Sequence, residues 1–127
     1  DFMGANCGIG PAELLHSVDN MRKSGLDTPL IAKGNCGIPA YVDGAIHYHG
    51  TPELMGDYAR FARDMGARII GGCCGTTPKH VAAMLAALVD NDPRPLDYQA
   101  MSAALGPAWA NVPEKPTAST RRRSRRR

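Results

Sequence analysis

The chain has 127 residues, of which 43% are hydrophobic and 21% charged, so its length fits one globular domain of ordinary size. The longest uninterrupted apolar run, at 81–89, falls far short of the roughly 20 residues that a membrane-spanning helix needs, and we expect a soluble, cytoplasmic protein. The net charge of +3 is uneven, since residues 1–106 carry −3 and residues 107–127 carry +6. The chain begins with Asp1 rather than Met, and we expect it to be part of a longer chain.

Three short apolar segments recur along the chain, and each is followed by a glycine-rich cysteine motif. The segments span 1–5, 30–33 and 67–70, and each is predicted to be a buried strand. The motifs are Gly-Ala-Asn-Cys-Gly-Ile (4–9), Gly-Asn-Cys-Gly-Ile (34–38) and Gly-Gly-Cys-Cys-Gly (71–75).

A helical pattern follows each motif. The three helices are predicted at 11–25, 51–66 and 77–90, because each range opens with a proline or a capping threonine. Their buried faces are predicted to consist of Leu14, Leu15, Val18 and Met21, then Met55, Tyr58, Ala59, Ala62 and Met65, and finally Val81, Met84, Leu85 and Leu88. A repeated strand, turn and helix is typical of a parallel α/β fold, either an open sheet or an arc of a barrel.

The repeating pattern ends after Asp90. Residues 91–95 are predicted to form a turn or linker, 98–105 a short surface helix and 106–120 a disordered linker. The tail at 121–127 has six Arg in seven residues, a composition that can bind nucleic acid or another acidic surface. Because the body of the chain shows no nucleic-acid-binding motif, a solvated tail without a specific partner is the favoured interpretation.

The four cysteines favour metal binding or catalysis, because a chain without a secretion signal is not expected to carry structural disulfides. The carboxyl ends of parallel strands meet at one rim, so these cysteines are expected to converge there. In their glycine-rich turn, Cys73 and Cys74 could direct both sulfurs to one zinc ion, with Cys7 as third ligand and a fourth position open. The alternative, a packed turn with buried thiols, is equally weighted on spacing alone.

Other candidates at the rim are weaker. Cys36 is expected to be a pocket thiol that does not bind metal, with a role as fourth ligand as the alternative. His47 and His49 alternate as on an extended segment; hydrogen bonding in a loop is favoured for them over direct chemistry. His16 and His80 are expected on helix surfaces.

Two asparagines precede cysteines in these motifs. The amides of Asn6 and Asn35 could bind substrate or orient a neighbouring thiolate. The alternative is that asparagine is simply tolerated at a left-handed turn position, and the two interpretations are equally weighted.

These motifs, taken together, resemble the homocysteine S-methyltransferase family, and most closely its bacterial betaine-dependent members. The resemblance rests on Gly-Ala-Asn-Cys-Gly (4–8), Lys-Gly-Asn-Cys-Gly-Ile-Pro (33–39) and Gly-Gly-Cys-Cys-Gly-Thr-Thr-Pro (71–78) with His80. It implies a (β/α)8 TIM barrel of which this chain holds only the last three or so β/α units. Residues 1–92 would be the C-terminal portion of the homocysteine-binding barrel domain, and 93–127 a linker and disordered Arg-rich tail.

The resemblance also implies a site and a reaction. Cys7, Cys73 and Cys74 would hold Zn²⁺, Asn6 and Asn35 would bind substrate, and homocysteine would accept a methyl group to give methionine. Betaine is the expected donor, with S-methylmethionine and a folate–corrinoid system as alternatives. We expect the segment alone to be incomplete as an enzyme, and the full-length protein could form a homo-oligomer. The competing hypothesis is a non-catalytic zinc-binding or thiol-rich module.

Overall fold

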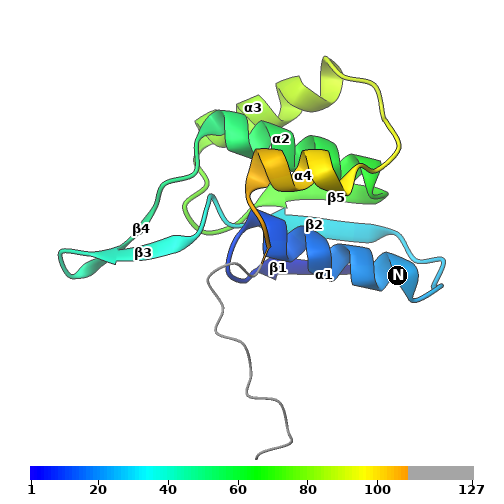
Figure 1. The fold of residues 1–127 in the computed structure, drawn as a ribbon, viewed down its shortest axis with the longest axis horizontal. Coiled ribbons are helices and arrows are strands. Elements are labelled where there is room, and N and C mark those ends of the chain that lie inside the picture. The colour runs from blue at the N-terminus through cyan, green and yellow to red at the C-terminus, as the bar shows by residue number, and fades with distance from the viewer. Residues whose placement is uncertain (109–127) are drawn as a thin grey trace, which may run out of the picture.

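Three parallel strands form the centre of the molecule in the computed structural model, which describes residues 1–108 (Figure 1). They are β1 (Met3–Cys7), β2 (Leu30–Gly34) and β5 (Ala67–Gly72), in the order β1-β2-β5. The predicted parallel α/β fold is therefore confirmed, although β1 and β5 continue further into their cysteine motifs than expected. The described residues form no closed barrel, and the (β/α)8 barrel remains a proposal. The Arg-rich tail and the linker from residue 109 lie outside the described residues.

The three predicted helices are α1 (Pro11–Lys23), α2 (Pro52–Asp64) and α3 (Pro78–Val89). Each begins with a proline, whose missing N–H would have no partner in the first turn of a helix. The predicted cap of α2 is confirmed, because the Thr51 hydroxyl accepts a hydrogen bond from the Leu54 N–H at 3.1 Å. Helix α1 packs on β1 and β2, α2 packs on β5, and α3 packs against α2. None of the helices in the described part of the chain has the length and apolar character to cross a membrane.

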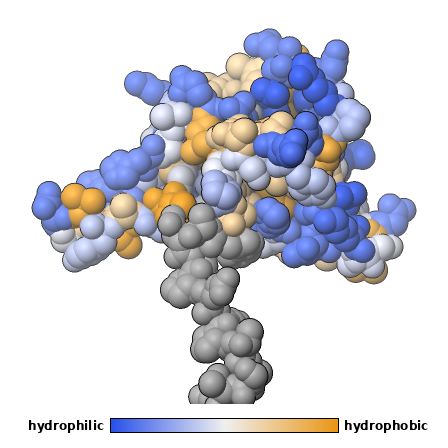
Figure 2. Space-filling view, in the orientation of Figure 1, coloured by the Kyte–Doolittle hydropathy of each residue, from blue (hydrophilic) through white to orange (hydrophobic). Residues whose placement is uncertain are grey.

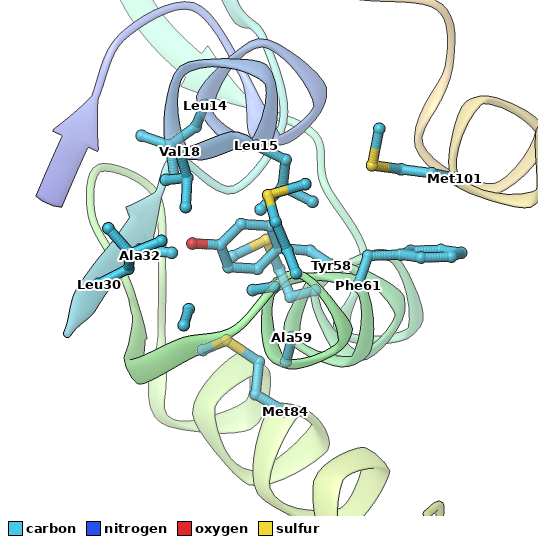
Figure 3. Close-up of a cluster of buried hydrophobic side chains, with 14 of the residues drawn as sticks. Leu14, Leu15, Val18, Leu30, Ala32, Tyr58, Ala59, Phe61, Met84 and Met101 are labelled. Carbon is cyan, nitrogen blue, oxygen red and sulfur yellow. The ribbon is translucent and has the colours of Figure 1, made fainter. Parts of the chain in front are cut away.

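The core lies between the sheet and helices α1 and α2, with Tyr58 at its centre (Figure 3). Tyr58 is fully buried, and its ring lies between Leu15 and Val18 of α1 and the strand that carries Ala32. Its hydroxyl accepts a hydrogen bond from the Gly34 N–H at 2.9 Å, which satisfies the polar end of a side chain that is otherwise apolar. Burial raises the pKa of Tyr58, so the hydroxyl stays protonated at neutral pH. This hydrogen bond joins the carboxyl end of β2 to the core.

One face of α3 differs from expectation. Val81 and Leu85 were predicted to be buried, but they are 52% and 63% exposed, and Met84 alone is fully part of the core. The reason is the close approach of α3 to Gly56 of α2, where an added Cβ would lie 3.4 Å from the Ala83 carbonyl oxygen. The small side chains of α3 face α2, so its larger branched residues turn outward.

An antiparallel hairpin, β3 (Pro39–Val42) and β4 (Ala45–Tyr48), separates β2 from α2 and projects from the body as an arm (Figure 1). Its turn residues Asp43 and Gly44 have φ values of 49° and 82°, as a two-residue type I′ turn requires. An Asp-Gly pair between apolar residues is a recognised hairpin signal, and it accounts for this departure from a purely parallel pattern.

The predicted helix at 98–105 is confirmed as α4 (Tyr98–Leu105). It is not a loosely attached surface helix, because Met101 is only 2% exposed and belongs to the core. Figure 3 shows Met101 beside Phe61 of α2. The Tyr98 hydroxyl donates a hydrogen bond to Asp19 of α1 at 2.8 Å, so α4 joins the two central helices.

Candidate metal centre

The register of the sheet brings the cysteine motifs to one edge. Cys7, the last residue of β1, pairs with Gly34 of β2, and Gly34 pairs in turn with Gly72 of β5. Cys73 follows directly after β5, so the cysteines of the first and third motifs lie on either side of the end of β2. The predicted convergence at the carboxyl ends of the strands is confirmed for Cys7, Cys73 and Cys74.

The three sulfurs lie at distances that suit a metal ion. Cys7 Sγ and Cys74 Sγ are 3.8 Å apart, Cys73 Sγ and Cys74 Sγ are 4.0 Å apart, and all three lie within 4.8 Å of one another. With Zn–S bonds of 2.3 Å, a tetrahedral site places its sulfurs about 3.8 Å apart. All three thiols are free rather than joined in a disulfide. The chemistry and spacing of the donors therefore fit zinc with one coordination position left open.

The backbone at Cys7 has an uncommon conformation. Its φ is 66°, and Cys7 and Asp43 are the two described residues other than glycine with positive φ. A side chain in this left-handed region costs of order 1 kcal/mol, and such residues cluster at functional sites. In this conformation the chain turns immediately after β1, and the Cys7 sulfur reaches the sulfurs beyond β2.

Backbone hydrogen bonds fix the loop that carries Cys73 and Cys74 against the end of β2. The Cys73 N–H donates to the Gly34 carbonyl oxygen at 2.7 Å, and the Cys36 N–H donates to the Cys74 carbonyl oxygen at 2.9 Å. The positions of Cys73 and Cys74 therefore depend on β2 as well as on their own strand.

Both predicted asparagines contact the cysteine loops. Asn35 is 1% exposed; its Nδ2 donates to the Gly8 carbonyl oxygen at 2.8 Å, and its Oδ1 accepts from the Cys74 N–H at 3.2 Å. Asn6 is exposed, and its Nδ2 points to the Cys73 sulfur at 3.9 Å. Asn35 thus bridges the loops that follow β1 and β5, whereas Asn6 contacts a candidate ligand atom directly.

These contacts set the acidity of the thiols. Partial burial opposes ionisation of Cys73, but hydrogen bonds from Asn6 and Cys7 outweigh it and hold the pKa of Cys73 below its usual value. The pKa of Cys74 is raised, first because its thiol is hydrogen-bonded to Cys7, although an interaction with Tyr48 opposes that change. Cys73 is therefore more readily available as a thiolate than Cys74.

The remaining candidates lie outside the sulfur cluster. Cys36 is buried, its thiol donates to the Gly50 carbonyl oxygen at 3.0 Å, and burial raises its pKa. His47 and His49 stack on each other, with ring centroids 6.0 Å apart. Among the described residues, neither histidine belongs to the group of side chains that could hold a metal ion.

His80 is more than a surface residue of its helix. Its Nδ1 accepts a hydrogen bond from the Thr77 N–H, and its Nε2 lies 3.0 Å from the Gly50 carbonyl oxygen. These contacts select the tautomer protonated at Nε2, which caps α3 and ties it to the chain after the hairpin. The sequence signal for this role is a threonine at the N-cap with a side chain able to hydrogen-bond three residues later.

The first two thirds of the chain resemble a known family of proteins. The sequence model of the homocysteine S-methyltransferase family matches residues 1–88. The chain is 35% identical over 89 residues to the methionine synthase of Mycobacterium leprae (strain TN), and 33% identical over 91 residues to that of Mycobacterium tuberculosis (strain ATCC 25618 / H37Rv). These alignments cover 69% and 71% of this chain, but 7% and 8% of the relatives. The chain thus spans less than a tenth of the length of either relative.

Proposed function

Because this chain belongs to the homocysteine S-methyltransferase family, we propose that it carries the zinc site at which homocysteine accepts a methyl group to form methionine. The observation that supports this most directly is the approach of Cys7, Cys73 and Cys74, whose sulfurs lie within 4.8 Å of one another. Three thiolates leave one of four tetrahedral positions open, as in catalytic rather than structural zinc sites.

The three cysteines would hold the zinc ion, and their sulfur atoms suit its preference for soft ligands. A zinc ion in this position supplies one piece of chemistry, which is to lower the pKa of a coordinating thiol so that homocysteine is a thiolate at neutral pH. The chain itself keeps the ligands in place, since Asn35 joins the two cysteine loops and β2 lies between them.

Asn6 and Asn35 are proposed to line the homocysteine site. Asn6 is the better placed for direct contact, because it is exposed beside Cys73, where an incoming substrate can reach its amide. The amide of Asn35 is already engaged at both ends and buried, which supports a role in shaping the pocket. In either role, a change in the conformation of the cysteine loops would alter how the substrate is held.

The wider assignment also belongs to this proposal. Residues 1–92 would form the C-terminal portion of a homocysteine-binding (β/α)8 barrel, and 93–127 a linker and tail. Betaine is the proposed methyl donor, on the resemblance of the cysteine motifs, and the cytoplasm the proposed location. An in-line transfer requires donor and thiolate to be held together, so the rest of the barrel would supply the donor pocket.

Metal analysis with matched cysteine variants tests the proposal. The full chain should contain about one zinc per molecule, and Cys73→Ala should lose it, because two thiolates remain of the three. Cys36→Ser is the control, since it keeps a hydrogen-bond donor to Gly50 and removes a cysteine that is not in the cluster. A Cys73→Ala protein with full zinc content would overturn the assignment.

A second measurement separates an enzyme site from a non-catalytic zinc module. In the chain loaded with Co²⁺, homocysteine should change the visible absorption spectrum, because a fourth sulfur enters the coordination sphere. A metal-loaded chain whose spectrum homocysteine leaves unchanged would favour the module. Methionine formation from homocysteine and betaine, measured on the complete barrel of this proposal, then tests the donor.

A further inference from the structure

Tyr48 is a residue of the hairpin that lies against the loop of Cys73 and Cys74. It is the last residue of β4 and pairs with Pro39, so it lies where the arm joins the body. Ile46, two positions earlier on the arm, is 63% exposed, whereas Tyr48 is half-buried and packs against the core. Figure 2 shows the outer part of the arm as a mixture of hydrophilic and hydrophobic surface.

The ring of Tyr48 lies directly over the loop that carries Cys74. A Cβ added at Gly75, the next residue, would overlap the Tyr48 Cβ and ring. Gly75 has a φ of 76°, so both its backbone conformation and the space above it demand glycine. Tyr48 can therefore occupy this position only because residue 75 has no side chain.

The side chain of Tyr48 lies within electrostatic reach of the sulfurs. Burial raises the pKa of Tyr48, and interactions with the Cys74 side chain and with the charges of Cys7 and Cys73 raise it further. Asn6 occupies the equivalent position at Cys73, where its amide points to the sulfur. Cys73 thus has a hydrogen-bond donor from a side chain outside the cluster, and Tyr48 lies where it could supply one to Cys74.

The base of the arm is held firmly enough to make this contact a fixed feature. The Gly50 carbonyl oxygen, two residues after Tyr48, accepts from Cys36 Sγ at 3.0 Å and lies 3.0 Å from His80 Nε2. The Gly50 N–H also donates to the Cys36 carbonyl oxygen at 3.0 Å. Cys36 and His80, which lie outside the cluster, hold the chain that presents Tyr48.

We propose that Tyr48 is a positioning residue of the metal centre: its hydroxyl donates a hydrogen bond to Cys74 Sγ, and its ring shields one side of the sulfur cluster. This inference rests on the proposed function, because it treats Cys74 as a metal ligand. A donor on a ligand sulfur orients the lone pairs that remain for the metal and reduces the electron density of the sulfur. The hairpin is then part of the site rather than an appendage to the sheet.

The test compares Tyr48→Phe with Tyr41→Phe in the full chain. Both changes delete one hydroxyl from the same hairpin, but Tyr41 is 77% exposed on the arm. With Co²⁺ as the probe, we expect the sulfur-to-cobalt charge-transfer band of Tyr48→Phe to move to lower energy. Competition with a chelator should show zinc affinity reduced by about 10-fold, as for other groups that support metal ligands. Tyr41→Phe should match the wild type in both.

Each outcome has a distinct meaning. A wild-type chain that binds neither Co²⁺ nor zinc overturns the proposed function and this inference with it. A wild type with a thiolate–cobalt band that Tyr48→Phe reproduces, in energy and in zinc affinity, overturns the role of Tyr48 alone. If Tyr48→Phe does not fold, the Tyr41→Phe chain decides: zinc loading should perturb its tyrosine ultraviolet absorption, and an unperturbed spectrum would overturn the inference.

Discussion

The two ends of the parallel sheet carry polar clusters of different kinds. At the carboxyl end, three thiols lie close together, and the Cys73 sulfur accepts a hydrogen bond from Asn6. Towards the amino end, Asp19 of α1 is 2% exposed and is surrounded by partners of opposite charge or by hydrogen-bond donors. One cluster gathers groups that can become anions, whereas the other neutralises the single anion it holds.

At the amino end, both oxygens of the Asp19 carboxylate have partners within the protein. Asp19 accepts from Arg22 at 2.7 Å and from Tyr98 at 2.8 Å, and it pairs with Lys23 at 2.6 Å. Figure 2 shows hydrophilic surface over this part of α1. A buried carboxylate with three partners stabilises the fold and docks α4, but it has little capacity left for a ligand. Changes at the carboxyl end of the sheet should therefore alter metal binding, whereas changes at the amino end should alter stability alone.

The largest effect of the three changes considered next is expected for Asn35→Ala. It leaves the Gly8 carbonyl oxygen and the Cys74 N–H without their partner in the protein, which should cost about 3 kcal/mol of unfolding free energy. Zinc affinity should fall as well, because the two cysteine loops lose their link. Urea unfolding of the zinc-free chain and a chelator titration measure the two effects. Asn20→Ala, at an exposed position of α1, is the control. If Asn35→Ala loses no more stability and zinc affinity than Asn20→Ala, the bridging role of Asn35 is refuted.

A smaller effect, confined to stability, is expected for Asp19→Asn. Burial alone would raise the pKa of Asp19, but hydrogen bonds from Lys23, Tyr98 and Arg22 outweigh it and lower that pKa. The carboxylate therefore contributes its full stability above its ordinary pKa of about 4, and this contribution is lost as pH falls through the lowered value. At pH 7 the variant should lose about 2 kcal/mol.

The same variant tests whether the two ends are independent. The gap in unfolding free energy between wild type and Asp19→Asn should close as pH is lowered, and zinc content at pH 7 should not change. Asp27→Asn, which alters an exposed carboxylate, serves as the matched control. If Asp19→Asn lost zinc with its fold intact, the two clusters would be coupled, and the two ends of the sheet would not be independent.

The smallest effect is expected for Tyr98→Phe. It removes one hydrogen bond to Asp19 and leaves the packing of Met101 in place, so a loss of about 1 kcal/mol is expected. Thermal unfolding of the variant measures it. If α4 were attached through Met101 alone, Tyr98→Phe would unfold at the temperature of the wild type.

Most of the framework was predictable because local signals and packing agree in it. Prolines and capping threonines mark the starts of the helices, and apolar spacing identifies the residues around Tyr58. The convergence of Cys7, Cys73 and Cys74 follows from parallel strands. The exposed positions of Val81 and Leu85 were not predictable from periodicity, because the approach of α3 to Gly56 decides which face of that helix is buried.

The supporting contacts of the site were the least accessible to sequence reasoning. The hairpin was signalled by Asp43-Gly44, but nothing local indicates that Tyr48 returns to a loop 26 positions further along the chain. The same holds for Asn35, whose two partners lie on different loops. Such contacts depend on how separate segments pack, which a pattern within one segment does not encode.

Because β2 lies between the candidate ligands, a bound metal ion would crosslink segments that are far apart along the chain. Cys7 and Cys74 are 67 positions apart, so a zinc ion held by both would close a loop of that length around the middle strand. By the relation used for covalent crosslinks, closing such a loop removes roughly 4 kcal/mol of chain entropy from the unfolded state. Binding and folding would then be linked, and the free metal concentration would help to set how much of the chain is folded.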